Sequence, residues 1–412
     1  MIWALAGLIA FLAAPPPNDL EQAVKALEAE NYAAAAPLLE KALAEDPENV
    51  EVRFNLAFAY TQLEQDAKAI EHYTKVVDLK PDLPQARLNL GMLLLRQNRP
   101  AEAVPHFEAL AAARADDFRV QFYYAHALEG SGGFEQAIAP YQRAVELDPN
   151  SADAALGLGR TLARAGRFEE AEPRYRQAAQ LDPELGGQML EFADLLEQNG
   201  RKQQALAVYQ DYLAGHPDAI AVKERVGLLL LDQKRYAEAV PVLESAVAQS
   251  PSAANQAALA EAYSLSDMPD KALPAWRAAV GADPESPALR VRYGNALLAA
   301  QLFDDAARNY YAALEKDPSL TDGWNGLAFS LYKLENYPGA LKALGELRQR
   351  GEEKPPAIFL AAIAQDKLQM YTEAKESYER FLAAGTGLED EEFQARQRIK
   401  VIDKILQKKL GK

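Results

Sequence analysis

The sequence predicts an all-α solenoid of about eleven helical hairpins. Three observations predict it: a marker alanine that recurs along the chain, a second small residue twelve positions before it, and a proline that follows most repeats. The alanine recurs every 34 residues, with a single step of 33 between Ala239 and Ala272. A fixed period of this size indicates one helix-turn-helix unit per repeat. The marker column consists of Ala35, Ala69, Ala103, Ala137, Ala171, Ala205, Ala239, Ala272, Ala306, Ala340 and Ala374.

The second small residue is alanine or glycine in all eleven repeats, which composition alone does not explain. Helix separation depends on side-chain size at the contact, so both small columns are expected where the two helices of a repeat cross. The first-helix column consists of Ala23, Ala57, Gly91, Ala125, Gly159, Ala193, Gly227, Ala260, Gly294, Ala328 and Ala362.

A bulky residue lies four positions after each marker alanine. This spacing places both residues on one helical face. The bulky side chain is therefore predicted to fill the space between successive hairpins. The column consists of Leu39, Tyr73, Phe107, Tyr141, Tyr175, Tyr209, Leu243, Trp276, Tyr310, Leu344 and Tyr378.

Prolines indicate where the second helices end and begin. One set follows the second helix, which proline prevents from continuing: Pro47, Pro81, Pro149, Pro183, Pro217, Pro251, Pro284 and Pro318. A further set lies two or three residues after the marker alanine: Pro37, Pro105, Pro140, Pro173, Pro241 and Pro274. Because proline inside a helix costs about 3 kcal/mol, these prolines predict that the second helix begins just before the marker alanine.

Residues 1–17 are predicted to be a signal peptide or an N-terminal anchor. The apolar run from Ile2 to Ala14 is shorter than the roughly 20 residues of a membrane span and matches the apolar core of a secretory signal. No Lys or Arg precedes the run, and cleavage after Ala14 would leave Pro15 first. An exported, periplasmic or envelope-associated protein is expected. The alternatives are a misassigned start or an apolar first turn, with a cytoplasmic location.

The repeat pattern ends near residue 386, and residues 387–412 are predicted to form a helix that caps the last repeat. Its apolar positions are Phe393, Ile399, Ile402, Leu406 and Leu410. Its basic residues allow two interpretations, a solvated cap face or a surface for an anionic partner or membrane.

The sequence offers no recognisable catalytic chemistry. It has no cysteine, and its four histidines, His72, His106, His126 and His216, have no metal-site spacing. No phosphate-binding loop or nucleophile motif occurs. We therefore expect no catalytic residue, no metal and no cofactor. A net charge of −16 argues against nucleic-acid binding, which needs a basic surface.

The columns resemble the tetratricopeptide repeat family, whose pattern is aromatic-x-x-Leu-Gly-x-x-Tyr, then Ala-x-x-x-aromatic, then Pro. Trp324, Leu327 and Ala328 match its start, and the repeat containing Leu259, Ala260, Tyr263, Ala272, Trp276, Ala279 and Pro284 matches its length. The resemblance covers residues 18–386. It implies a right-handed superhelical solenoid and a non-catalytic role in binding proteins or peptides.

The resemblance also implies a concave groove that is lined by the first helix of each repeat. The side chains three residues before and one residue after the small residue of that helix are expected to face the groove. The alternative is that the aromatic residues there are core. The predicted partner-binding residues hold these positions or the neighbouring position that borders the groove. They are Phe54, Phe58, Phe122, Tyr123, His126, Glu191, Asp194, Glu224, Arg225, Asn325 and Phe329.

The leading functional hypothesis is a scaffold or adaptor that binds a partner protein or peptide in an exported or envelope-associated complex. The alternative is a cytoplasmic regulatory subunit of an enzyme or secretion complex. Neither hypothesis involves nucleic acid, and membrane contact is expected only through the N-terminal apolar segment. The sequence leaves the oligomeric state open.

Overall fold

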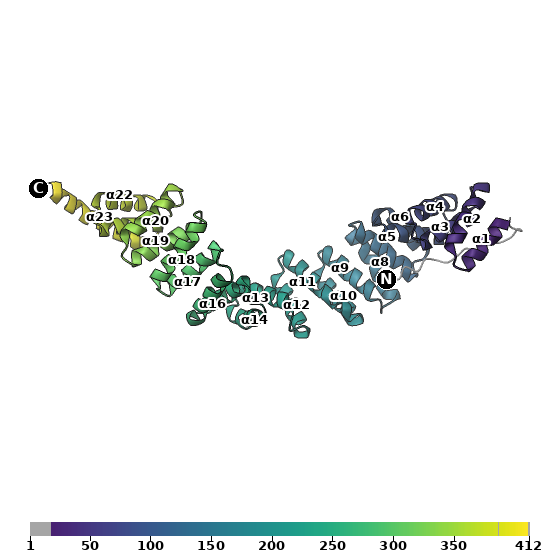
Figure 1. Cartoon of the computed structure of the whole chain (residues 1–412), viewed down its shortest axis with the longest axis horizontal. Helices are drawn as coiled ribbons and strands as arrows, with labels where there is room; N and C mark the ends of the chain where they lie inside the picture. Colours follow the sequence, from purple (N-terminus) through teal and green to yellow (C-terminus); the bar gives the residue numbers. More distant parts are fainter. Residues whose placement is uncertain (1–17, 386, 411–412) are drawn as a thin grey trace. The chain divides into compact units, whose positions relative to one another are not determined.

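The computed structural model describes residues 18–385 and 387–410, so the predicted signal segment 1–17 lies outside the described residues. The described chain contains α-helices and one 3-10 helix, and no strand. It divides into two compact units, Met1–Val208 and Tyr209–Lys412. Figure 1 shows the helices of each unit in chain order. The predicted all-α solenoid of helical hairpins is confirmed.

The first unit is a row of antiparallel helix pairs (Figure 1). From α1 to α10, each odd-numbered helix packs against its even-numbered successor, and each even-numbered helix packs on the next repeat. Its elements are α1 (Asn18–Glu28), α2 (Tyr32–Glu45), α3 (Val50–Gln62), α4 (Asp66–Leu79), α5 (Pro84–Arg96), α6 (Pro100–Ala113), α7 (Phe118–Gly130), α8 (Phe134–Leu147), α9 (Ala152–Arg164), α10 (Phe168–Leu181), the 3-10 helix η1 (Pro183–Gly187) and α11 (Gln188–Gln198). Helix α12 (Lys202–Gly215) contains the boundary between the units.

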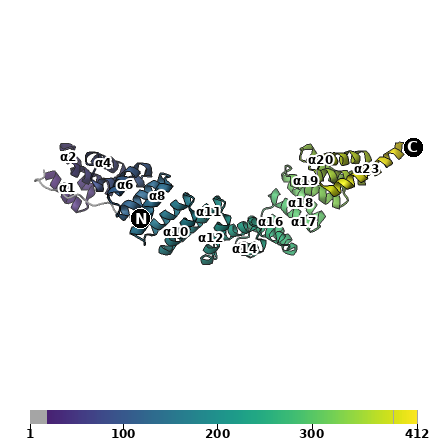
Figure 2. The ribbon, with the colours of Figure 1, turned by 180° about the vertical axis from the view of Figure 1, so that it is seen from behind.

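The second unit repeats the same pairing and ends in a longer helix (Figure 2). Here the first helices of successive repeats also contact one another, as α17 does with α19 and α19 with α21. The elements are α13 (Ile220–Asp232), α14 (Tyr236–Gln249), α15 (Ala253–Leu265), α16 (Pro269–Ala282), α17 (Pro287–Ala299), α18 (Phe303–Lys316), α19 (Thr321–Lys333), α20 (Tyr337–Gln349), α21 (Pro355–Lys367), α22 (Tyr371–Ala383) and α23 (Glu389–Leu410).

The turn inside each hairpin contains one residue with a positive φ. After α1, the Glu30 amide (φ 55°) donates to the Leu27 carbonyl and the Asn31 amide donates to the Ala26 carbonyl. This pair of bonds satisfies carbonyls that the helix end would otherwise leave unpaired. The remaining positive-φ turn residues are Glu64, Asn98, Gly132, Gly166, Gly200, Lys234, Asp267, Gln301, Glu335 and Gln369. Since most are not glycine, the sequence alone did not reveal this turn.

The second helices begin just before the marker alanine, as predicted, but the prolines that follow the alanine lie beyond the first turn. Helix α2 begins at Tyr32, three residues before Ala35, so Pro37 is its sixth residue. Pro105, Pro173, Pro241 and Pro274 hold the same position, and Pro140 lies one residue further into α8. Each proline removes the amide that would bond the carbonyl four residues earlier. The six residues that lose this partner, Ala33, Ala101, Gln136, Glu169, Ala237 and Asp270, are all exposed. Water can therefore bind these carbonyls, which makes the prolines tolerable.

Both small-residue columns are buried, and the first-helix column makes room for a bulky side chain. A Cβ added at Gly294 would lie 2.8 Å from Cε1 of Tyr310, in the second helix of the same repeat. Gly91 stands in the same relation to Phe107. A larger residue in this column would overlap the bulky ring.

The bulky residue also contacts the next repeat, through the residue sixteen positions later; we call these two residues an interface pair. In the pair of Tyr73 and Asn89, the asparagine Nδ2 donates to the tyrosine hydroxyl at 2.9 Å. Arg292 lies over the Trp276 ring at 4.8 Å. In Tyr310 and Gly326, a Cβ on the glycine would lie 2.6 Å from Cε1 of the tyrosine. The predicted filling of the space between hairpins is confirmed, with a different chemistry in each of these pairs.

The last helix, α23, packs on the end of the second unit. Ala395 and Ile402 are fully buried, in a cluster with Tyr378 and Phe381 of α22. Predicted core positions Ile399 and Leu406 pack against the same cluster. Phe393 does not, because its side chain is 63% exposed. Phe393 of α23 therefore faces away from the repeat that the helix covers.

Candidate functional site

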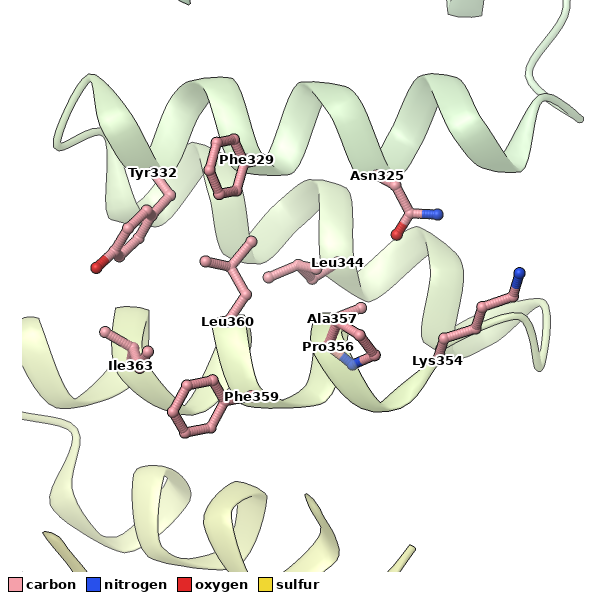
Figure 3. A pocket seen from close by; sticks show the side chains of 10 residues that line it. All are labelled: Asn325, Phe329, Tyr332, Leu344, Lys354, Pro356, Ala357, Phe359, Leu360 and Ile363. Carbon is pink, nitrogen blue, oxygen red and sulfur yellow. The ribbon is translucent and has the colours of Figure 1, made fainter. Parts of the chain in front are cut away.

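An apolar groove lies between α19 and α21 of the second unit, with a volume of about 510 Å³. Figure 3 shows the side chains that line it. Asn325, Phe329 and Tyr332 of α19 form one wall, and Leu344 of α20 lies at its base. The opposite wall is formed by α21 and the residue before it: Lys354, Pro356, Ala357, Phe359, Leu360 and Ile363. The groove is thus formed between the first helices of successive repeats.

Helical spacing places these side chains. Asn325, Phe329 and Tyr332 are four and three residues apart, so they share one face of α19. Phe359 and Ile363 share a face of α21 in the same way. Packing fixes the Phe359 ring, whose centroid lies 4.9 Å from that of Phe381 and 6.0 Å from that of Tyr378. The groove is therefore bordered by rings that already have a fixed orientation.

The groove has a polar end and an apolar end. Figure 3 shows Asn325 and Lys354 at one end, and Tyr332 and Ile363 at the other. The Asn325 amide donates to the Thr321 carbonyl at 3.1 Å. Lys354 is exposed and forms no ion pair with any residue that the structure describes. A bound segment would therefore meet one cationic group beside an apolar surface.

A second cavity, of about 480 Å³, continues from the first. The two share Tyr332, Phe359 and Ile363. Helix α23 supplies its far wall, with Phe393, Gln394, Gln397, Arg398 and Val401. Arg398 donates from Nη2 to Asp366 of α21 at 2.8 Å and from Nε to the other carboxylate oxygen. This hydrogen-bonded pairing raises the pKa of Arg398.

Two predicted binding residues, Phe54 and Phe58, are core residues. Phe54 is fully buried, with its ring 5.3 Å from that of Tyr73. Phe58 is 8% exposed, because Tyr32 packs against it edge-on at 5.8 Å. Neither ring can contact a partner while these neighbours stay in place. At these two positions the structure therefore supports the alternative, that the aromatic residues are core.

The other predicted residues of the first unit lie on α7 and α11. Phe122 stacks on Phe118 at 5.8 Å and on His126 at 6.3 Å, and only His126 of these three is exposed. Tyr123 is half-buried against Phe107. On α11, Glu191 and Asp194 reach the surface to different extents. These positions remain predictions.

A small charged cavity adjoins His126 in the first unit, lined also by Glu129, Arg160, Arg164 and Glu191. Glu129 accepts a hydrogen bond from the Tyr141 hydroxyl at 2.7 Å and one from Arg160 Nε at 3.2 Å. Burial raises the pKa of Glu129, but His126, Arg160 and Tyr141 together lower it below its ordinary value. Arg164 pairs with Glu191 at 3.9 Å. The charges of this cavity are therefore engaged with one another.

The remaining predicted residues belong to the second unit. Glu224 of α13 accepts a hydrogen bond from Asn255 at 2.6 Å, and Arg225 beside it is exposed. Asn325 and Phe329 line the groove, where Phe329 is 36% exposed. Sequence reasoning missed Tyr332, Leu360, Phe393 and Val401 as groove residues. Phe393 was predicted to be a covered position of the cap helix, whereas its side chain is 63% exposed and lines the second cavity.

The described residues contain no group of His, Cys, Asp and Glu that could hold a metal ion. No helix among them is long and apolar enough to cross a membrane.

Comparison with known proteins gives a consistent family assignment. One tetratricopeptide repeat model matches residues 88–152, 125–185, 190–254 and 258–321, together more than half of the chain. Related repeat models match residues 26–72, 59–98 and 356–384. No curated protein matches.

Several solved structures are similar over part of the chain. MamA of AMB-1 is 27% identical over 40% of this chain and 96% of its own, with a TM-score of 0.38. MamA from Desulfovibrio magneticus RS-1 is 23% identical over 40% of this chain and 94% of its own, with a TM-score of 0.37. YrrB, described as a TPR protein with an unusual peptide-binding site, is 21% identical over 40% and 85%, with a TM-score of 0.38.

Proposed function

Because the chain belongs to the tetratricopeptide repeat family, we propose that it is a non-catalytic scaffold that binds a segment of another protein in the groove between α19 and α21. The observation that supports this proposal is the apolar lining of that groove, in which the Phe359 ring is held in place by core rings. Large exposed apolar patches on soluble proteins usually mark interaction sites.

The groove has the features of an energetic centre of binding. Aromatic side chains that a partner covers completely supply a large share of binding energy, about 2 kcal/mol or more for a dominant residue. Phe329 is the most accessible ring of this wall, and covering it removes apolar surface from water. Phe359 is already ordered, so binding pays little further side-chain entropy there.

The test is capture of native partners by the full chain and by Phe329→Ala. We expect the variant to lose at least tenfold in affinity for the captured partner, about 1.4 kcal/mol, while its helical circular dichroism is unchanged. Tyr311→Ala is the matched control, because Tyr311 is 47% exposed on α18 and does not line the groove. Equal capture by Phe329→Ala and the unsubstituted chain would place binding on another surface.

We further propose that the protein works in an exported or envelope-associated complex, on the strength of the apolar run from Ile2 to Ala14. Deleting residues 2–14 should leave the protein folded but in the cytoplasm of its native host. Fractionation and determination of the mature amino terminus measure the result. An unaltered distribution would instead favour a cytoplasmic regulatory subunit of an enzyme or secretion complex.

A further inference from the structure

We propose that α23 is a wall of the binding groove as well as the end of the fold, and that the groove takes a partner segment of apolar residues joined to a carboxylate-bearing residue. This inference rests on the proposed function and names the chemistry of the partner. It concerns the continuous surface formed by α19, α21 and α23, which we call the extended groove.

The outward face of α23 carries large apolar side chains. A helix that only closes a solenoid carries a polar outer face. On α23, Phe393 is 63% exposed and Val401 is 42% exposed, two turns apart on the same face. Both line the second cavity, opposite Phe359 and Ile363. Phe393 is the most exposed large apolar side chain that the structure describes.

The two cavities form one continuous surface. Tyr332, Phe359 and Ile363 line both cavities, so a ligand can pass from one to the other without leaving the apolar surface. Neighbouring helices pack about 10 Å apart, so three first helices span roughly 20 Å. An extended segment of about six residues covers that length.

The charge of the groove lining favours an acidic ligand. The charged side chains that line the extended groove are Lys354 and Arg398, and both are basic. Arg398 is already neutralised by Asp366. Lys354 is not paired with any described residue, and Lys333 lies over the Phe329 ring at 5.3 Å. An acidic residue of the partner can therefore bind at the Lys354 end, while no lining carboxylate repels it.

The surface is held ready for binding. Arg398 ties α23 to α21, and Lys375 of α22 donates to Asp403 of α23 at 2.6 Å. Ile402 and Ala395 anchor the opposite face of α23 in the core. Phe393 and Val401 can therefore be changed without removing the contacts that hold the helix.

The experiment is selection of a displayed library of random 16-residue peptides on the immobilised full chain. We expect the enriched peptides to combine large apolar residues with Asp or Glu on one side. A selected peptide is then synthesised, and its affinity for variants is measured by fluorescence anisotropy. Phe393→Ala and Val401→Ser should each weaken binding at least tenfold, whereas Tyr311→Ala should not.

The charge component has its own test. Lys354→Glu should lower the affinity for the acidic peptide at least tenfold. The same variant should bind more tightly to a peptide whose acidic residue is replaced by lysine. Lys342→Glu, on the outer side of α20, is the matched control. A peptide that loses affinity with Phe329→Ala but not with Phe393→Ala would overturn the role of α23 and leave the proposed function standing.

Three further outcomes would contradict the inference or a part of it. Failure to enrich any peptide family would count against both the inference and the proposed function. A dimer in sedimentation experiments that Phe393→Ala dissociates would assign the surface to a second copy of the chain and overturn the inference. Enriched peptides that are basic rather than acidic would overturn the charge component.

Discussion

Gly326→Ala is expected to lower the free energy of unfolding by about 1 to 3 kcal/mol, because the added methyl group overlaps the Tyr310 ring. The added Cβ would lie 2.6 Å from Cε1 of this fully buried tyrosine. The ring cannot move freely, since its hydroxyl donates to Asn295 at 2.6 Å and its other face meets Gly294. Denaturant unfolding of the second unit, followed by circular dichroism, measures the change.

Gly345→Ala supplies the control for the same substitution. Gly345 lies inside α20, and no described atom lies within 4 Å of the position that its Cβ would take. Alanine is favoured over glycine inside a helix by roughly 0.5 to 1 kcal/mol. We therefore expect this variant to be slightly more stable than the unsubstituted protein. Similar destabilisation by both substitutions would show that the contact with Tyr310 is not the cause.

Arg398→Ala is expected to release α23 from the second unit. Asp366 has a side chain only 10% exposed, and Arg398 is the partner that neutralises it. Removing one member of a buried ion pair leaves an uncompensated charge, and since Arg398 is 40% exposed, we expect a cost of about 2 kcal/mol. Hydrogen exchange of the α23 amides should accelerate, while exchange in α13 to α18 should not change.

The matched control for this effect is on the same helix. Arg396 pairs with Glu392 at 2.9 Å, but its side chain is 63% exposed. Exposed pairs of this kind contribute about 0.3 to 0.5 kcal/mol, so Arg396→Ala should leave exchange of α23 almost unchanged. If Arg398→Ala behaves like Arg396→Ala, the hydrogen bonds between α23 and α21 do not hold the helix.

The sequence was sufficient to predict the repeat and its packing columns, because a small residue at a helix crossing is a requirement of every repeat. Gly294 and Tyr310 lie where the periodicity placed them. The tolerance of prolines inside the second helices was not predictable in the same way. The cost assigned to Pro37 assumed a carbonyl without a partner, whereas Ala33, which carries that carbonyl, is exposed to water.

The sequence predicted which way the side chains of the binding surface point, but it did not predict how exposed they are. Phe58 and Phe329 hold the same slot of their repeats, yet Phe58 is 8% exposed and Phe329 is 36% exposed. Tyr32 of the preceding repeat packs on Phe58 and covers its ring. Periodicity determines where a side chain points. It does not determine which side chains of adjoining repeats cover it.

The interface pairs have a consequence for the order in which the repeats follow one another. Loss of residues 277–310 would preserve the period and leave two complete neighbouring hairpins. It would also bring Trp276 sixteen positions before Gly326, so that the indole would meet a glycine instead of the Arg292 guanidinium that now lies over it. Tyr73 likewise needs an amide that Gly326 cannot supply. Recombination that joins such unlike units therefore yields junctions whose interface pairs do not match, and a hairpin that packs on a non-equivalent hairpin of another nascent chain loses these contacts.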